Sequence, residues 1–146
     1  MKRFFIVTAF VLMAGLLMAD VCPEQSYFPI PTTMDPNQIV TDPVTGDKLL
    51  VSVGQGIVGI PYTIQGRTCD PDEGDKVRAY LLPDGPELVL DPNGCFTIPV
   101  NLVRGGWTYV SVGATDGIAE RCGTYAVYAR VNRPPSLCGG LSAAAR

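Results

Sequence analysis

The side chains best suited to chemistry in this sequence are carboxylates gathered in one short stretch. Residues 70–75 read Asp-Pro-Asp-Glu-Gly-Asp, so four of six positions are acidic. Unpaired charge is not buried in a protein core, so this stretch should be a loop that is either solvated or holds a cation. A second acidic turn, Ala114-Thr115-Asp116-Gly117, follows later in the chain.

Catalytic chemistry has little support in the residue types. The chain has no histidine, which excludes Ser/His and Cys/His nucleophile pairs. Paired carboxylates can hydrolyse a glycosidic bond, but no feature of the pattern builds a substrate cleft around them. We therefore expect a non-catalytic protein.

The N-terminal residues have the pattern of a secretory signal peptide. A short basic start (residues 1–3) precedes an uncharged, mostly apolar run over 4–18 that ends at Ala19. A membrane span needs about 20 apolar residues, and here Asp20 follows at once. We expect residues 1–19 to be removed and the protein to be secreted or placed on the cell surface. In the alternative, a lipoprotein would be acylated at Cys22, but residues 19–21 lack the small side chains usual before such a cysteine.

All five cysteines, Cys22, Cys69, Cys95, Cys122 and Cys138, lie beyond this leader. In an exported chain they indicate disulfides. A metal site would need closely spaced pairs and histidine, and the chain has neither. The odd number leaves one thiol free or bonded to another chain.

Acidic residues outnumber basic ones by 14 to 11, which gives a formal net charge of −3. No basic cluster is present, so a nucleic-acid partner and an anionic membrane surface are both disfavoured. We expect the partners to be other protein chains, copies of the same chain or a surface polysaccharide.

Two regions of different texture follow the leader. Residues 20–44 are rich in proline and show little apolar periodicity, so we expect an extended arm or linker rather than a packed element, ordered only by docking. Residues 45–133 show short runs of β-branched and aromatic residues, punctuated by Gly, Pro, Asn and Asp, which is typical of an all-β sandwich. Residues 134–146 should form a flexible tail.

We expect seven strands, in which apolar and polar residues alternate and so mark the buried face. In the last two strands, the residues that share the apolar face are Val110, Val112 and Ala114, and Tyr125, Val127, Ala129 and Val131. Pro61, inside the second of them, indicates a bulge or an edge position. The predicted strands cover 49–53, 57–68, 76–82, 87–90, 95–100, 107–115 and 121–131.

Several turn motifs occur in a recurring order. They are Val53-Gly54, residues 70–75, Asp91-Pro92-Asn93-Gly94 ahead of Phe96-Thr97, Ala114-Thr115-Asp116-Gly117, and Val131-Asn132-Arg133-Pro134-Pro135. With these motifs the chain resembles the cadherin-like, immunoglobulin-fold repeats of prokaryotic secreted and cell-surface proteins. It departs from that pattern in having one copy, extra cysteines and Glu73 inserted in the commoner Asp-Pro-Asp-Gly-Asp turn.

The resemblance implies a seven-stranded immunoglobulin-like sandwich in which the loops after strands two and six emerge at the same end. The acidic turns would then meet, and Ca²⁺ would relieve the repulsion between their carboxylates. The alternative is a pair of solvated turns. The candidate calcium ligands are Asp70, Asp72, Asp75 and Asp116.

The same topology brings Cys69 next to Cys122 and suggests a disulfide that would tie the two loops together. Cys95 should open a strand at the same end and is a rival partner for either. Cys22 and Cys138 lie outside the predicted domain and suit bonds to another chain or to Cys95. The candidates for a bond to another chain are Cys22, Cys95 and Cys138.

The function we expect is that of an exported structural or adhesive surface module that self-associates. One alternative is a carbohydrate-binding module that uses Trp107 and Tyr109 as an aromatic platform, although Trp107 packed at the start of a strand would explain the same residues. Another is an extracellular filament subunit in which residues 20–44 add a strand to a neighbour's sheet.

Overall fold

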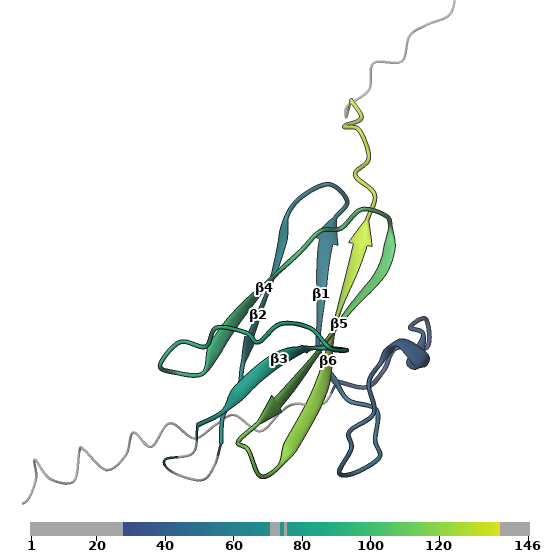
Figure 1. Ribbon diagram of the computed structural model, residues 1–146. Coiled ribbons are helices and arrows are strands. Elements are labelled where there is room, and N and C mark those ends of the chain that lie inside the picture. Colours follow the sequence, from purple (N-terminus) through teal and green to yellow (C-terminus); the bar gives the residue numbers. More distant parts are fainter. Residues whose placement is uncertain (1–27, 71–73, 75, 138–146) are drawn as a thin grey trace, which may run out of the picture.

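Two β-sheets pack face to face in the computed structural model, which describes residues 28–70, 74 and 76–137 (Figure 1). The first sheet has the strand order β1-β6-β5-β3, and the second pairs β2 with β4. The fold is therefore an all-β sandwich, as the alternation of residues predicts. The strands are β1 (Leu50–Ile57), β2 (Tyr62–Arg67), β3 (Arg78–Leu82), β4 (Cys95–Val100), β5 (Gly106–Thr115) and β6 (Glu120–Arg130).

The described residues form six named strands instead of the seven expected. The predicted strand over 87–90 is absent, and only an isolated bridge joins Glu87 to Tyr80 of β3. A strand needs a continuous ladder of partners, and Val89, 91% exposed, lies against none. The turn after it is as predicted, because the Gly94 N–H donates to the Asp91 carbonyl at 2.9 Å.

The first strand was predicted to end at residue 53, but β1 continues through Gly54 and Gly56 to Ile57. β1 pairs with β6 in parallel as far as Ile57, so Ile57 closes this strand and does not open the next. A side chain at Gly54 would collide with Tyr62 of β2, and one at Gly56 would collide with Leu102. Glycine within a strand often marks such a close approach. Pro61 lies before β2 rather than inside a strand.

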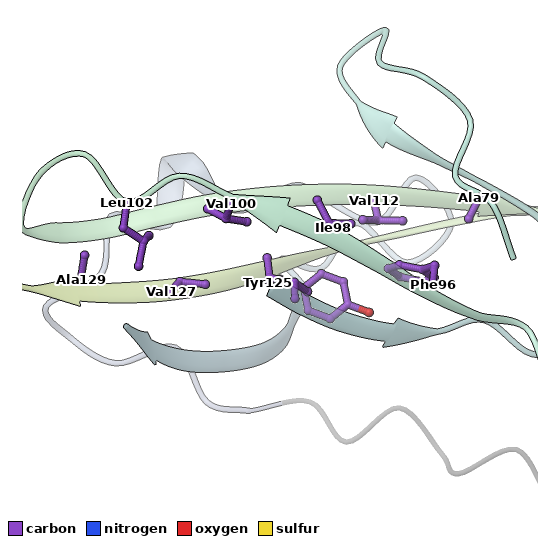
Figure 2. Packing of buried hydrophobic residues seen from close by; sticks show 10 residues of the cluster. Ala79, Phe96, Ile98, Val100, Leu102, Val112, Tyr125, Val127 and Ala129 are labelled. Carbon is purple, nitrogen blue, oxygen red and sulfur yellow. The ribbon is translucent and has the colours of Figure 1, made fainter. Parts of the chain in front are cut away.

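The main core lies between the two sheets (Figure 2). In β6, alternate residues face inward, so Tyr125, Val127 and Ala129 are buried against the facing pair of strands. Phe96 of β4 meets the Tyr125 ring edge-on, with the ring centroids 6.1 Å apart. This inward set is the one that the period-two pattern predicts.

A second, smaller core lies on the outer face of the four-stranded sheet. Here residues 28–48, which we call the N-terminal segment, pack Met34 and Ile39 against Leu50 and Ala126. The segment includes the short 3₁₀ helix η1 (Pro36–Gln38) and lies beside the sheet in Figure 1. Both faces of this sheet are therefore covered by the chain itself.

This packing differs from the arm or linker expected over residues 20–44. In the described part of that range, Met34 and Ile39 are only 5% and 3% exposed. These contacts could not be predicted from helical or strand periodicity, because the apolar residues that contact the sheet are single and irregularly spaced. The described residues of this range are ordered by docking on the sheet, which is the way in which we expected any order to arise there.

The docked segment yields a direct test of its contribution to stability. Ile39→Ala should lower the free energy of unfolding by about 3 kcal/mol, because it removes buried methyl groups and leaves a cavity. Val44→Ala, in the same segment but 62% exposed, is the matched control and should change stability by less than about 0.5 kcal/mol. Urea unfolding of both variants gives the comparison. Equal stability of the Ile39 variant and the wild type would show that the segment does not contribute to the fold.

Candidate functional site

The turn at Asp116 is held by its own carboxylate. Asp116 Oδ1 accepts hydrogen bonds from the N–H groups of Ile118 and Ala119, both at 2.7 Å. These bonds, the one from Ala119 first, hold the pKa of Asp116 below its ordinary value. The side chain thus has a structural task in turn geometry, which matches the alternative to a calcium ligand.

The other acidic loop is only partly described. Asp70 is half-buried after the end of β2, whereas the predicted ligands Asp72 and Asp75 lie outside the described residues. Among the residues that are described, no group of three or more His, Cys, Asp or Glu side chains gathers in a way that suits a metal ion. Calcium binding by Asp70, Asp72, Asp75 and Asp116 therefore stays a prediction.

The predicted disulfide between Cys69 and Cys122 is wrong. Cys122 is a free thiol, and so is Cys95, whereas Cys69 is disulfide-bonded. The partner of Cys69 is therefore not among the described cysteines; Cys22 and Cys138 both lie outside the described residues.

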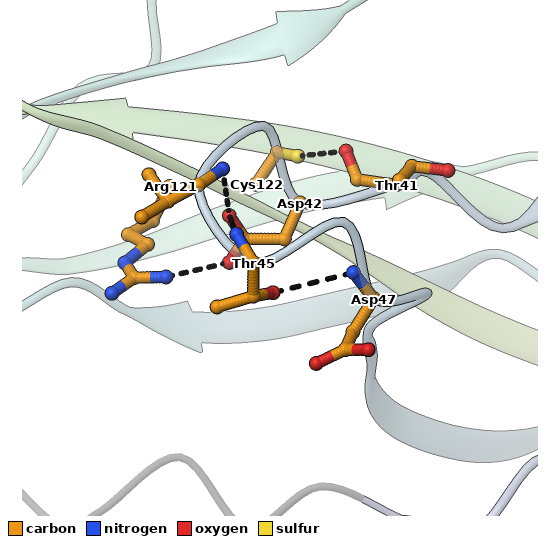
Figure 3. A network of polar contacts seen from close by, with 7 residues as sticks. Thr41, Asp42, Thr45, Asp47, Arg121 and Cys122 are labelled. Atoms are coloured by element: carbon orange, nitrogen blue, oxygen red, sulfur yellow. Dashed lines mark hydrogen bonds and ion pairs between the residues drawn. The ribbon is translucent and has the colours of Figure 1, made fainter.

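The alternation of β6 explains this outcome. Cys122 shares the outer face of the strand with Thr124 and Ala126, so its side chain faces the N-terminal segment and not β2. Its Sγ donates to the Thr41 carbonyl at 3.2 Å (Figure 3). Burial raises the pKa of the Cys122 thiol, and the nearby Asp42 carboxylate adds to the effect.

The aromatic pair proposed as a glycan platform lies beneath the N-terminal segment. Trp107 and Tyr109 are half-buried and pack against the second core. The Tyr109 hydroxyl accepts a hydrogen bond from the Asp35 N–H at 3.0 Å, and Trp107 also meets Tyr128 with ring centroids 5.1 Å apart. This arrangement resembles the packed alternative more than an exposed platform.

A buried aspartate anchors the N-terminal segment to the sheet (Figure 3). Asp42 is 1% exposed, and its Oδ2 lies 2.8 Å from an Arg121 guanidinium nitrogen on β6. Its Oδ1 accepts hydrogen bonds from the backbone N–H groups of Val44 and Thr45, at 2.7 and 3.3 Å. This anchor was not predicted, although Asp42-Pro43 with Gly46 soon after is a usual turn signal.

Opposing effects set the charge of Asp42. Burial alone would raise the pKa of its carboxyl group, but the bonds from Val44, Arg121 and Thr45 together outweigh burial and lower the pKa from 3.8. The carboxylate is therefore ionised at neutral pH.

A hydroxyl supplies a second anchor in the middle of the sheet. Thr124 of β6 is fully buried, and its Oγ1 accepts a hydrogen bond from the Val40 N–H at 3.1 Å. The same oxygen lies 3.0 Å from Ser111 Oγ on β5. The polar groups that are buried under the segment are thus hydrogen-bonded, as burial requires.

One end of the sandwich, uppermost in Figure 1, is formed by loops 58–61 and 101–105 and by the residues after β6, and we call it the apolar end. It holds Ile60, Val103 and Val131, which are 53%, 82% and 66% exposed. Hydrogen bonds join its loops: the Gly59 N–H donates to the Leu102 carbonyl, and the Val58 N–H to the Arg130 carbonyl, both at 2.9 Å.

The charged side chains of the apolar end are all positive. Its described residues, 56–61, 101–106 and 128–137, carry three exposed arginines and no acidic side chain. A groove of about 730 Å³ runs past Tyr128, Arg130 and Arg133 beside this patch. Adjacent apolar and cationic side chains at the end of a domain suit contact with another molecule.

Comparisons with known proteins add no identification, since no family, no curated protein and no solved structure matches the chain. Within the described ranges, none of the helical structure is long and apolar enough to cross a membrane.

The Asp42 anchor predicts a pH-dependent contribution to stability. Because the folded pKa lies below the ordinary value of 3.8, the ionised group stabilises the folded state above that pH and loses this effect as the pH falls through the folded pKa. Asp42→Asn should therefore be less stable than the wild type by about 2 kcal/mol near neutral pH. The difference should shrink below pH 3.8.

Urea unfolding of both proteins across this pH range measures the difference. Asp47→Asn changes an exposed carboxylate in the same turn and is the control, with little expected effect. A stability gap between Asp42→Asn and the wild type that stays constant with pH would contradict the role given to the charge.

Proposed function

We propose that the chain is an exported, non-catalytic module that acts at the cell surface as a structural or adhesive element, joining copies of itself. The observation that carries this proposal is the apolar end, where three aliphatic side chains are more than half exposed. Isolated exposed apolar residues are common, but three at one end of a domain, beside cationic side chains, are typical of an interaction site.

Export is supported by the sequence pattern of the leader. Residues 1–19 combine a basic start with an apolar run and a small residue at the expected cleavage point. The cysteines downstream suit an oxidising compartment. A secreted or surface location follows from these features as part of the proposal.

The finer fold that we propose is an immunoglobulin-like, cadherin-like sandwich. In the count of seven predicted strands, β2 and β4 are the second and fifth, and β3, β5 and β6 are the third, sixth and seventh. In the immunoglobulin fold the second and fifth strands share one sheet, while the third, sixth and seventh share the other. The pairing of β2 with β4, and of β3 and β6 with β5, is compatible with this arrangement. Adhesion and spacing are usual tasks of such domains.

The two alternatives receive less support. A glycan platform at Trp107 would have to form where the N-terminal segment already packs. A filament built by strand addition from residues 20–44 would have to release Met34 and Ile39, which are buried on their own sheet.

Bead clumping tests the proposal. The full chain, produced with its leader and recovered as the exported protein, is tethered to beads at fixed density. We expect wild-type beads to clump and Val103→Ser beads to clump several-fold less, because the substitution removes apolar area from the contact.

Ile118→Ser is the matched control, since Ile118 is 91% exposed but lies in the turn after β5, at the opposite end. It should clump like the wild type. Dispersed wild-type beads, or equal clumping of all three proteins, would overturn the adhesive function. Retention on polysaccharide columns that Trp107→Ala abolishes would favour the glycan-binding alternative instead.

A further inference from the structure

The edges of the four-stranded sheet are partly occupied by the chain itself. At β3, the Leu81 N–H donates to the Pro86 carbonyl at 3.1 Å, and the Leu88 N–H to the Ala79 carbonyl at 2.8 Å. At the start of β1, the Phe28 N–H donates to the Leu50 carbonyl at 3.3 Å. Neither edge offers a whole strand for pairing.

In the two-stranded sheet, the hydrogen-bond pattern between β2 and β4 shows which backbone groups of β2 point outward. The Thr68 N–H donates to the Gly94 carbonyl at 2.8 Å, and residues opposite each other in an antiparallel pair alternate between bonded and non-bonded. The even-numbered residues of β2 are therefore the ones whose backbone groups bond to β4, and the odd-numbered residues are the non-bonded ones. The N–H and C=O groups of Thr63, Gln65 and Arg67 point away from β4.

The two outward edges of this sheet are not equivalent. The cross-strand partners of Thr63 and Gln65 are Pro99 and Thr97, so Pro99 lies at an outward position of β4. Proline has no N–H, and it protects an edge strand from further pairing. The outward edge of β2 contains no proline and no lysine, and it keeps all of its backbone donors.

Space is available along the β2 edge. A groove of about 260 Å³ separates β2 from β1 and is lined by Val53 on one side and Thr63 and Gln65 on the other. Thr63 and Gln65 are exposed. In the described part of the chain, no other strand pairs with this edge.

The β2 edge is also complementary to itself. When two copies of β2 run antiparallel about Gln65, each Gln65 lies opposite its counterpart, and each Thr63 lies opposite an Arg67. The outward positions then form the bonded pairs, and no like charges face each other across the contact. A two-fold contact of this kind closes on itself and gives a dimer.

From these observations we infer that β2 is a docking edge for β2 of a second copy, so that two sandwiches join through a continuous sheet of order β4-β2-β2-β4. The inference deepens the proposed function, on which it rests for the choice of a second copy as partner. The edge provides pairwise joining, whereas the apolar end provides adhesion between such pairs.

Matched proline substitutions on one cross-strand pair test the inference. Gln65→Pro removes an outward N–H from β2, whereas Thr97→Pro removes one from its partner on β4, at the opposite edge of the same sheet. Sedimentation equilibrium of the full exported chain, with free thiols blocked by iodoacetamide, measures the mass over a concentration series. We expect a reversible dimer for the wild type and Thr97→Pro, and dimerisation at least tenfold weaker for Gln65→Pro.

Charge variants keep the test valid if a proline variant fails to fold. Gln65→Lys and Gln65→Glu each place like charges opposite one another at the two-fold axis and should each weaken the dimer. A mixture of the two should form a 1:1 heterodimer, which a misfolded protein would not do. A wild type that stays monomeric, equal loss in both proline variants, or a mixture that stays monomeric would overturn the inference.

The bead assay separates this inference from the proposed function. Clumping that depends on Val103 without a dimer in solution would remove the β2 contact and leave the adhesive function. A dimer that depends on Gln65 without clumping would support the β2 contact and remove the adhesive function.

Discussion

The structure depends on covering the second face of its larger sheet. A sheet with apolar residues on both faces needs a layer on each side, and β2 and β4 supply only one. The N-terminal segment supplies the other by placing Met34 and Ile39 over Leu50 and Ala126. Polar anchors at Asp42 and Thr124 fix the position of this layer, because the bond from Arg121 to Asp42 and the bond from the Val40 N–H to Thr124 join the segment to the sheet.

The same constraint determines which surfaces remain for partners. Residues 28–48 cross the outer face of the larger sheet, and among the described residues no strand pairs with the outward edge of β2. The aromatic side chains Trp107 and Tyr109 are used beneath the segment. The β2 edge and the apolar end are left uncovered by the described residues, and the proposals made above rely on them.

Residue alternation made much of the sheet predictable. The inward and outward sets of β5 and β6 are those predicted from the sequence, because successive side chains of a strand point to opposite faces of the sheet. The same alternation, carried back from Tyr125 to Cys122, places Cys122 on the outer face and so argues against a bond to Cys69. The disulfide prediction relied on the positions of the loops and did not consider which face of the strand the Cys122 side chain occupies.

Other features lacked a local signal. β1 extends through Gly54 and Gly56, which have low strand propensity. Glycine is required there because the side chains of Tyr62 and Leu102 occupy the space that a side chain would fill. The docking of residues 28–48 depends on a few irregularly spaced side chains meeting a distant surface. Long-range contacts of this kind leave no periodic pattern, so the sequence predicted an arm where the structure has a covering layer.

Amide hydrogen exchange tests most directly whether the N-terminal segment is part of the folded unit. The N–H groups of Val40 and Leu49 donate to Thr124 Oγ1 and to the Val40 carbonyl, respectively. We predict that both exchange with protection comparable to that of the central residues of β6, as parts of one cooperative unit. Exchange of Val40 and Leu49 at the rate of an unstructured peptide, while β6 stays protected, would contradict this account.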